Sequence, residues 1–118
     1  MNKPVIVYTG GPGSGKSYQA TMYARTRGIL YTAVRWVVIK AHILCGHPEK
    51  VLEFVNNNHL FVDEYDINDE ESNKWIHQLQ RTFNIKVLIC SQAQPVVDLP
   101  ESFIAITCDI RLKGVAHG

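Results

Sequence analysis

Gly10-Gly11-Pro12-Gly13-Ser14-Gly15-Lys16-Ser17 spells G-x-x-x-x-G-K-S. This spacing is typical of a phosphate-binding loop, in which glycines let backbone N–H groups approach phosphate oxygens at the start of a helix. The positive end of the helix dipole adds to the same site. Lys16 is expected to supply a point charge for the β- and γ-phosphates, and the Ser17 hydroxyl to bind Mg²⁺. The residues predicted to contact the nucleotide are Gly10, Gly11, Pro12, Gly13, Ser14, Gly15, Lys16, Ser17 and Tyr18.

The residues on either side of this loop support the interpretation. Pro4-Val5-Ile6-Val7-Tyr8 is an apolar run typical of a buried strand, and the stretch from Tyr18 to Arg27 is compatible with a helix. A strand, a glycine-rich loop and a helix in this order form the Walker A element of P-loop NTPases. The sequence therefore predicts an α/β fold of that class, a three-layer sandwich with a mainly parallel sheet, in a single domain over residues 1–118.

A second motif supplies two carboxylates. His59-Leu60-Phe61-Val62-Asp63-Glu64 is a short apolar run that ends in acids, the Walker B pattern. A buried strand would deliver Asp63 to the carboxyl edge of a parallel sheet, where ligands bind in such folds. Asp63 is expected to hold Mg²⁺, directly or through water. Glu64 then stands where a general base orients the attacking water, and it is the predicted catalytic carboxylate.

The rest of the chain alternates between strand-like and helix-like patterns, as a parallel α/β sheet requires. Between residues 35 and 45 the pattern leaves strand and helix open, because Val37-Val38-Ile39 suits either. Further helices are expected to begin at His47-Pro48-Glu49 and at Asn68, the second ending near Phe83. The predicted strands are Lys3–Thr9, Ile29–Ala33, the run ending at Glu64, Lys86–Cys90 and Phe103–Cys108.

Composition bounds the class of protein. Of the 118 residues, 46% are hydrophobic and 19% are charged, which describes an ordinary globular domain. No apolar run reaches the length of about 18 residues that a membrane span needs, so a cytoplasmic protein is expected, in the host cytoplasm if it is viral. Residues 1–48 hold no acid, whereas residues 63–71 hold six. This asymmetry suits a basic surface for DNA, complementary faces of neighbouring subunits, or an arrangement without function.

A third motif places a polar residue after another strand, since Ser91-Gln92 follows Lys86–Cys90. With the Walker A and Asp63-Glu64 motifs, it resembles the additional-strand ATPases, in which a strand with a polar sensor lies between the other two. The motifs resemble most the zonula occludens toxin family of phage-assembly ATPases and the FtsK/HerA-type viral genome-packaging ATPases. The resemblance implies that Gln92 senses the γ-phosphate or the attacking water. It also implies a ring, often hexameric, that hydrolyses ATP with Mg²⁺ and moves double-stranded or single-stranded DNA.

A ring ATPase of this kind is expected to complete each site with an arginine from the neighbouring subunit. Arg111, after the last predicted strand, is the first candidate for this catalytic role, and Arg81 is the second. The chain departs from these families in having a short segment between its nucleotide motifs and no membrane anchor. Two interpretations therefore stay open: a minimal viral or plasmid ATPase, and the trimmed nucleotide domain of a longer protein.

Two other functions use the same residues. A loader or switch ATPase would use ATP binding to control assembly and would turn over slowly. A nucleotide or small-molecule kinase also opens with such a loop, but the sequence has no arginine-rich lid segment, and Asp63-Glu64 suits water activation better.

Overall fold

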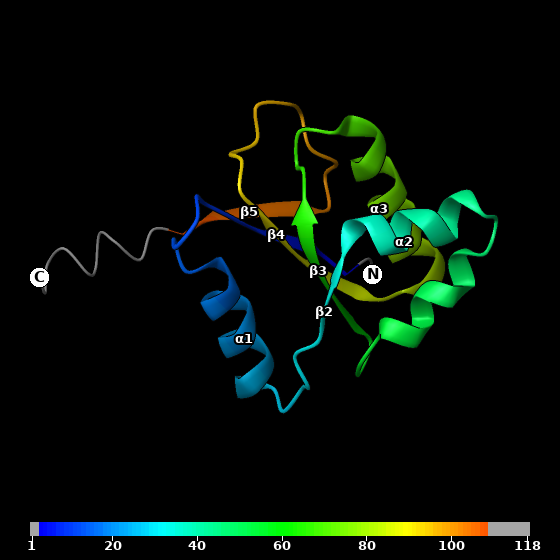
Figure 1. The fold of residues 1–118 in the computed structure, drawn as a ribbon, viewed down its shortest axis with the longest axis horizontal. Helices are drawn as coiled ribbons and strands as arrows, with labels where there is room; N and C mark the ends of the chain where they lie inside the picture. Colours follow the sequence, from blue (N-terminus) through cyan, green and yellow to red (C-terminus); the bar gives the residue numbers. More distant parts are fainter. Residues whose placement is uncertain (1–2, 109–118) are drawn as a thin grey trace, which may run out of the picture.

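The structure of the protein is a computed structural model, which describes residues 3–108. Strands and helices alternate along most of the chain (Figure 1). The strands are β1 (Val5–Thr9), β2 (Ala33–Arg35), β3 (His59–Tyr65), β4 (Lys86–Ser91) and β5 (Phe103–Thr107). The helices are α1 (Lys16–Thr26), α2 (Trp36–Leu44), the 3₁₀ helix η1 (Pro48–Phe54) and α3 (Glu70–Phe83).

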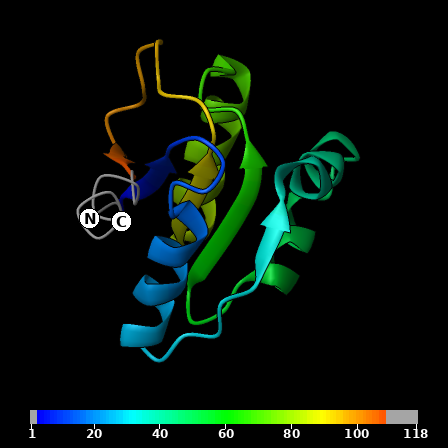
Figure 2. The same cartoon turned by 60° about the vertical axis from the view of Figure 1, so that its left-hand side comes forward.

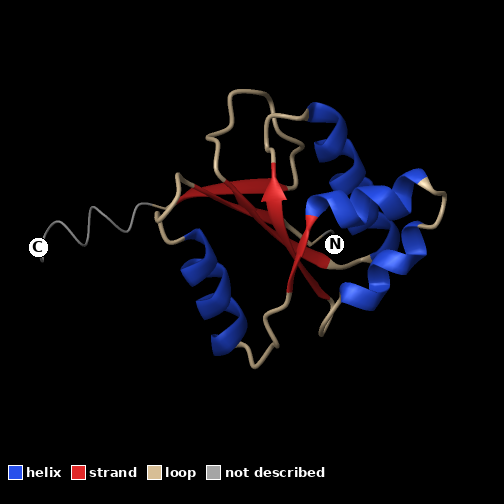
Figure 3. Cartoon of the chain, viewed as in Figure 1, coloured by secondary structure: helices blue, strands red, loops and turns tan. Residues whose placement is uncertain are grey.

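The five strands form one sheet in the order β2-β3-β4-β1-β5, and each neighbouring pair is parallel. The strands are drawn in red in Figure 3. Strand β4 therefore lies between β1, which leads into the glycine-rich loop, and β3, which carries the two acids. This is the arrangement that the additional-strand prediction requires. Because all strands are parallel, the residues that follow β1, β3 and β4 meet at one carboxyl edge of the sheet.

The sheet separates two apolar layers. Successive side chains of a strand point to opposite faces. In β4, Val87 and Ile89 join the core beneath α2, η1 and α3, whereas Leu88 and Cys90 join the core beneath α1. Figures 1 and 2 show α1 alone on one face of the sheet and the other helices on the opposite face. The central strands are buried from both sides, which explains their continuous apolar sequences.

The structure differs from the sequence-based prediction between β1 and β3. The predicted strand Ile29–Ala33 is wrong for most of its length, because β2 covers only Ala33–Arg35 and residues 29–32 form a loop. Ile29 is apolar because it packs with α1 in the core, not because it pairs with a strand. The segment left open becomes helix α2, whose Trp36 and Ile39 turn inward onto the larger core.

Candidate active site

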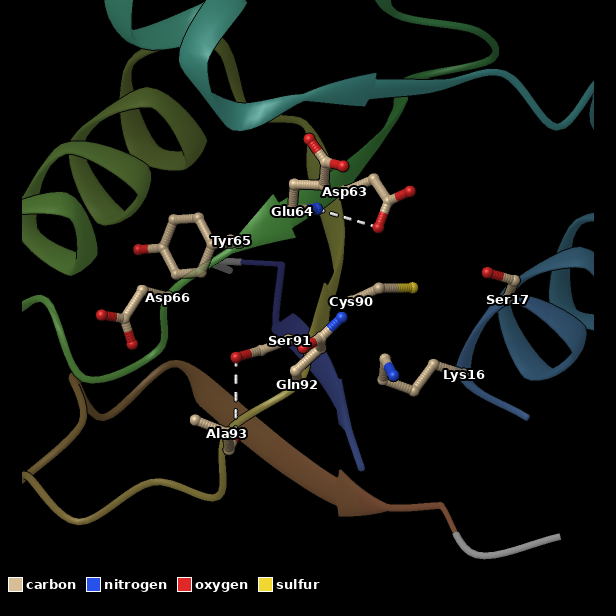
Figure 4. Close-up of a pocket in the computed structure, with 10 residues that line it drawn as sticks. All are labelled: Lys16, Ser17, Asp63, Glu64, Tyr65, Asp66, Cys90, Ser91, Gln92 and Ala93. Carbon is tan, nitrogen blue, oxygen red and sulfur yellow. Dashed lines mark hydrogen bonds between the residues drawn. The ribbon is translucent and has the colours of Figure 1, made fainter. Parts of the chain in front are cut away.

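The carboxyl edge of the sheet holds a cleft of about 620 Å³. Side chains from three separate motifs line it, and they include five residues that the sequence assigns to nucleotide chemistry (Figure 4). The lining residues are Lys16, Ser17, Asp63, Glu64, Tyr65, Asp66, Cys90, Ser91, Gln92 and Ala93. The fold therefore brings together the lysine, hydroxyl, carboxylates and amide that were predicted to act on one ligand.

The glycine-rich loop turns tightly between β1 and α1. An added Cβ on Gly10 (φ +153°) would clash with the Ser14 side chain and come within 2.5 Å of the Cys108 carbonyl oxygen, so only glycine fits there. The Lys16 ammonium donates to the carbonyl oxygens of Gly10 (2.7 Å) and Gly11 (3.0 Å). Lys16 is thus folded back over its own loop, and its charge is held there by neutral acceptors alone among the described residues.

One buried polar atom of the loop has no partner. Ser14 is 3% exposed, and its hydroxyl forms no hydrogen bond with the described residues. A buried hydroxyl without a partner costs about 1–3 kcal/mol, and such groups in a native fold call for an explanation. A phosphate oxygen entering the loop would supply an acceptor, so the loop fits a phosphorylated ligand.

A bulge at the end of β3 sets the position of the acids. Val62 pairs with Ile89 and Tyr65 pairs with Ser91, so β3 has one more residue than β4 between these pairs. Glu64 adopts the left-handed conformation with φ 51°. This conformation costs a non-glycine residue about 1–2 kcal/mol. Strain of this kind concentrates at functional sites, where the surrounding fold maintains it.

The bulge sends the two carboxylates in different directions. Figure 4 shows the Asp63 carboxylate turned toward Ser17, with the Glu64 carboxylate turned toward β2. The Glu64 amide donates to Asp63 Oδ1 at 2.8 Å, which stabilises the turn. Arg35, the last residue of β2, places its Nη1 3.9 Å from Glu64 Oε2. Both side chains are mostly exposed, so this ion pair contributes little to stability.

Strand β4 forms the floor of the cleft between the lysine and the acids. Burial, together with the nearby Asp63 charge, raises the pKa of the Cys90 thiol to about 11, so Cys90 is neutral at physiological pH. The Ser91 hydroxyl accepts from the Ile67 amide at 3.3 Å and donates to the Ala93 carbonyl oxygen at 3.5 Å. Gln92 lies next in the chain, exposed at the cleft surface between Lys16 and the carboxylates.

A buried network supports the end of β3 from below. The Trp36 indole N–H donates to the Ser72 hydroxyl at 3.1 Å, and Ser72 donates to Asp69 Oδ2 at 2.7 Å. The hydrogen bond from Ser72 lowers the pKa of Asp69. Tyr65 packs edge-on against Trp36, with ring centroids 5.1 Å apart, and donates to Asn73 Oδ1 at 2.6 Å. These contacts fix the starts of α2 and α3 beneath the bulge.

Asn68 joins the β3–α3 connection to the loop between β4 and β5. Its amide nitrogen donates to the Gln94 carbonyl oxygen at 3.0 Å, and its amide oxygen accepts from the Val96 amide at 2.7 Å. The Gln94 side chain in turn accepts a hydrogen bond from the buried Thr9 hydroxyl at 3.1 Å. Neither Asn68 nor Gln94 stands in a motif, so the sequence did not indicate them.

Asn68→Ala is expected to loosen the loop that carries Gln92. Loss of both hydrogen bonds should lower the free energy of unfolding by about 1 kcal/mol and speed hydrogen exchange at the Val96 amide. Exchange followed by mass spectrometry or NMR measures this directly. Asn68→Asp keeps the acceptor for Val96 and removes the donor to Gln94, so it should protect the Val96 amide better than alanine does. Unchanged Val96 exchange in Asn68→Ala would contradict this role for Asn68.

Several predicted site residues are not among those that line the cleft. Residues 10–15 form the glycine-rich loop that leads to Lys16, and their contact with the nucleotide stays a prediction. Tyr18 is 57% exposed at the start of α1, and its nucleotide contact stays a prediction. Arg111 lies outside the described residues. Arg81 lies on α3, beside Pro4 and Glu101 in a hollow near the amino end of β1, so it does not reach the cleft of its own subunit. A role for either arginine in a neighbouring subunit stays a prediction.

The fold has a counterpart among solved structures. It is similar to the crystal structure of a DNA replication initiation factor, with a TM-score of 0.53 and 14% sequence identity. The similarity covers 97% of this chain and 44% of that chain, so this chain spans less than half the length of that protein. At this identity the similarity shows the fold alone. No protein-family model matches the chain, and no curated protein sequence matches it significantly.

The strand order, the glycine-rich loop after β1 and this similarity agree on one class of fold. The chain has the α/β fold of the P-loop NTPases, with the additional strand β4 between β1 and β3. Within residues 3–108, no helix is both long and apolar enough to cross a membrane.

Proposed function

We propose that this protein hydrolyses ATP in the cleft at the carboxyl edge of its sheet. The observation that carries the proposal is that Lys16 of α1 meets Asp63 and Glu64 of β3 around one cavity. A lysine at the start of a helix, a strand-end aspartate and an adjacent glutamate are together the groups that phosphoryl transfer to water requires.

Each residue has a role in this proposal. Lys16 exchanges the carbonyl oxygens of Gly10 and Gly11 for oxygens of the β- and γ-phosphates, where its charge is compensated. Glu64 accepts a proton from the attacking water. Gln92 donates its amide N–H to the γ-phosphate or holds the water in line.

The cleft also fits a magnesium ion. The donor set is a hydroxyl and a carboxylate, which are oxygen ligands of the kind that Mg²⁺ prefers, and Figure 4 shows Asp63 turned toward Ser17. Ser17 and Asp63 would hold the ion, and it would neutralise charge that develops on the phosphate oxygens.

The finer assignment is an ATPase whose turnover is linked to DNA. The three motifs resemble those of phage-assembly and genome-packaging ATPases, and a DNA replication initiation factor shares the fold. A ring of subunits, each giving Arg111 or Arg81 to its neighbour, is the form of assembly that these families imply. In this proposal the protein is a viral or plasmid motor, and a loader or switch ATPase is the same site with slow turnover.

Phosphate release from ATP and Mg²⁺, with and without duplex or single-stranded DNA, tests the link to DNA. Light scattering on the same samples gives the size of the assembly. A motor requires turnover that rises with DNA in an oligomeric fraction. A turnover rate that does not change with DNA would overturn the motor assignment and leave the hydrolytic site in place. Phosphate that appears only on a nucleotide acceptor would identify a kinase.

A further inference from the structure

A basic hollow lies at the amino edge of the sheet, opposite the ATP cleft. It has a volume of about 540 Å³, and Lys3, Arg27 and Lys86 lie on its walls with His59. These residues come from four segments that are far apart in sequence: the residues before β1, the end of α1, and the starts of β4 and β3. Figure 2 shows the end of α1 and the start of β3 at the same lower edge of the molecule.

Neutral groups hold the three cations of the hollow in place. The Lys3 ammonium donates to the Asn84 carbonyl oxygen at 3.1 Å. The Arg27 guanidinium lies 3.6 Å from the centroid of the Tyr23 ring, and the Lys86 ammonium lies 5.0 Å from the same centroid. No aspartate or glutamate is among the described residues that line the hollow. Three positive charges therefore converge there without a carboxylate to compensate them.

Arg27 keeps donors available for a ligand. Its two hydrogen bonds, to the Tyr23 carbonyl oxygen and the Thr26 hydroxyl, are both 3.2 Å long and both use Nη1. Within the described part of the chain, the remaining guanidinium N–H groups make no hydrogen bond. The guanidinium is thus oriented by its neighbours, and its planar fork matches the oxygens of a phosphate group.

His59 forms the inner wall of the hollow and is uncharged. Its Nδ1 lies 2.7 Å from the Asn57 carbonyl oxygen, which can only accept, so Nδ1 carries the proton and Nε2 accepts from the Tyr23 hydroxyl at 3.0 Å. Burial lowers the pKa of His59, and the charges of Lys86, Lys3 and Arg27 lower it further. His59 therefore holds Tyr23 in position by a hydrogen bond, and the Tyr23 ring contacts Arg27 and Lys86.

We propose that this hollow binds the phosphate backbone of a nucleic acid, with Lys3, Arg27 and Lys86 each neutralising a phosphate. The inference rests on the proposed link between the ATPase and DNA, which makes DNA the polyanion. Several cations from separate segments around one open hollow suit successive phosphates of a strand better than a single anion. Helix α1 spans from Lys16 in the ATP cleft to the residues beside Arg27, a length of about 16 Å, so it connects the two sites.

Lys3→Gln with Lys86→Gln tests the inference. Binding of a fluorescent DNA oligonucleotide to the full chain is measured by anisotropy across a series of salt concentrations. The double variant should bind at least about tenfold more weakly at 50 mM salt. The slope of log affinity against log salt should fall by about 2, because each removed lysine leaves one phosphate with its counterion. ATP hydrolysis without DNA should stay at the wild-type rate.

Lys50→Gln with Lys74→Gln is the matched control, because both lysines are exposed, neither lines the hollow, and the net charge changes equally. Wild-type affinity and slope in Lys3→Gln with Lys86→Gln would overturn this site while leaving DNA-stimulated turnover, and hence the proposed function, intact. Equal weakening by the control pair would also overturn it. Binding of the wild-type chain to anionic phospholipid vesicles through these lysines, without binding to DNA, would overturn both the inference and the proposed link to DNA. The rate of ATP hydrolysis then tests the assignment of the cleft separately.

Discussion

Glu64→Gln is expected to bind ATP as the wild-type protein does and to hydrolyse it at least about 100-fold more slowly, the scale that general bases contribute. The amide has the shape of the carboxylate and cannot take a proton from water. Nucleotide affinity should be preserved, because Lys16 and the glycine-rich loop are untouched. Steady-state phosphate release and calorimetric ATP titration measure the two quantities separately.

Two variants separate the chemistry of Glu64 from its ion pair. Arg35→Gln breaks the pair of 3.9 Å and keeps the carboxylate. If the loss in Glu64→Gln came from the broken pair, Arg35→Gln would reproduce it. Glu53→Gln removes an exposed carboxylate in η1, away from the cleft, and should leave turnover unchanged. Near-wild-type turnover in Glu64→Gln would mean that another group activates the water.

Lys16→Ala is expected to weaken ATP binding by about 10- to 100-fold, because hydrogen bonds to charged groups contribute about 1.5–3 kcal/mol. In the variant, only the backbone dipoles of the loop would stabilise the negative charge of the phosphates. The variant also loses the two hydrogen bonds that tie the lysine to Gly10 and Gly11 when no ligand is bound.

Thermal unfolding with and without ATP measures the loss of affinity for Lys16→Ala. ATP at about 100 times the wild-type Kd should stabilise the wild-type chain by about 2.7 kcal/mol and the variant by much less. Lys74→Ala removes an exposed lysine of α3 outside the cleft and should retain the full ATP-induced shift. An equal shift in Lys16→Ala would remove the phosphate-binding assignment of the loop.

The central strands could be predicted from sequence because burial on both faces requires continuous apolar runs. Thus β3 and β4 begin at the predicted residues His59 and Lys86. The parallel order then places Lys16, Asp63 and Gln92 at one edge of the sheet, as expected. The edge strand β2 could not be predicted, because three residues pair on one side only and Ile29 is apolar for another reason.

The finer geometry of the cleft depends on contacts that no local pattern encodes. Nothing in the sequence indicates that Glu64 adopts φ 51°, because glutamate rarely does and the bulge arises from the pairing of β3 with β4.

The basic residues of the stretch 1–48 do not form one surface. Lys16 and Arg35 lie at the carboxyl edge of the sheet, whereas Lys3 and Arg27 lie at the opposite edge with Lys86.

A single-turnover experiment tests most directly whether the cleft hydrolyses ATP. Protein in excess over γ-labelled ATP and Mg²⁺ is quenched at successive times, so that the chemical step is observed apart from product release. We expect free labelled phosphate to appear in one exponential phase with the wild-type chain, and bound ATP to remain intact over the same period with Glu64→Gln. Intact ATP in both, or equal rates of phosphate formation in both, would contradict hydrolysis at this cleft by Glu64.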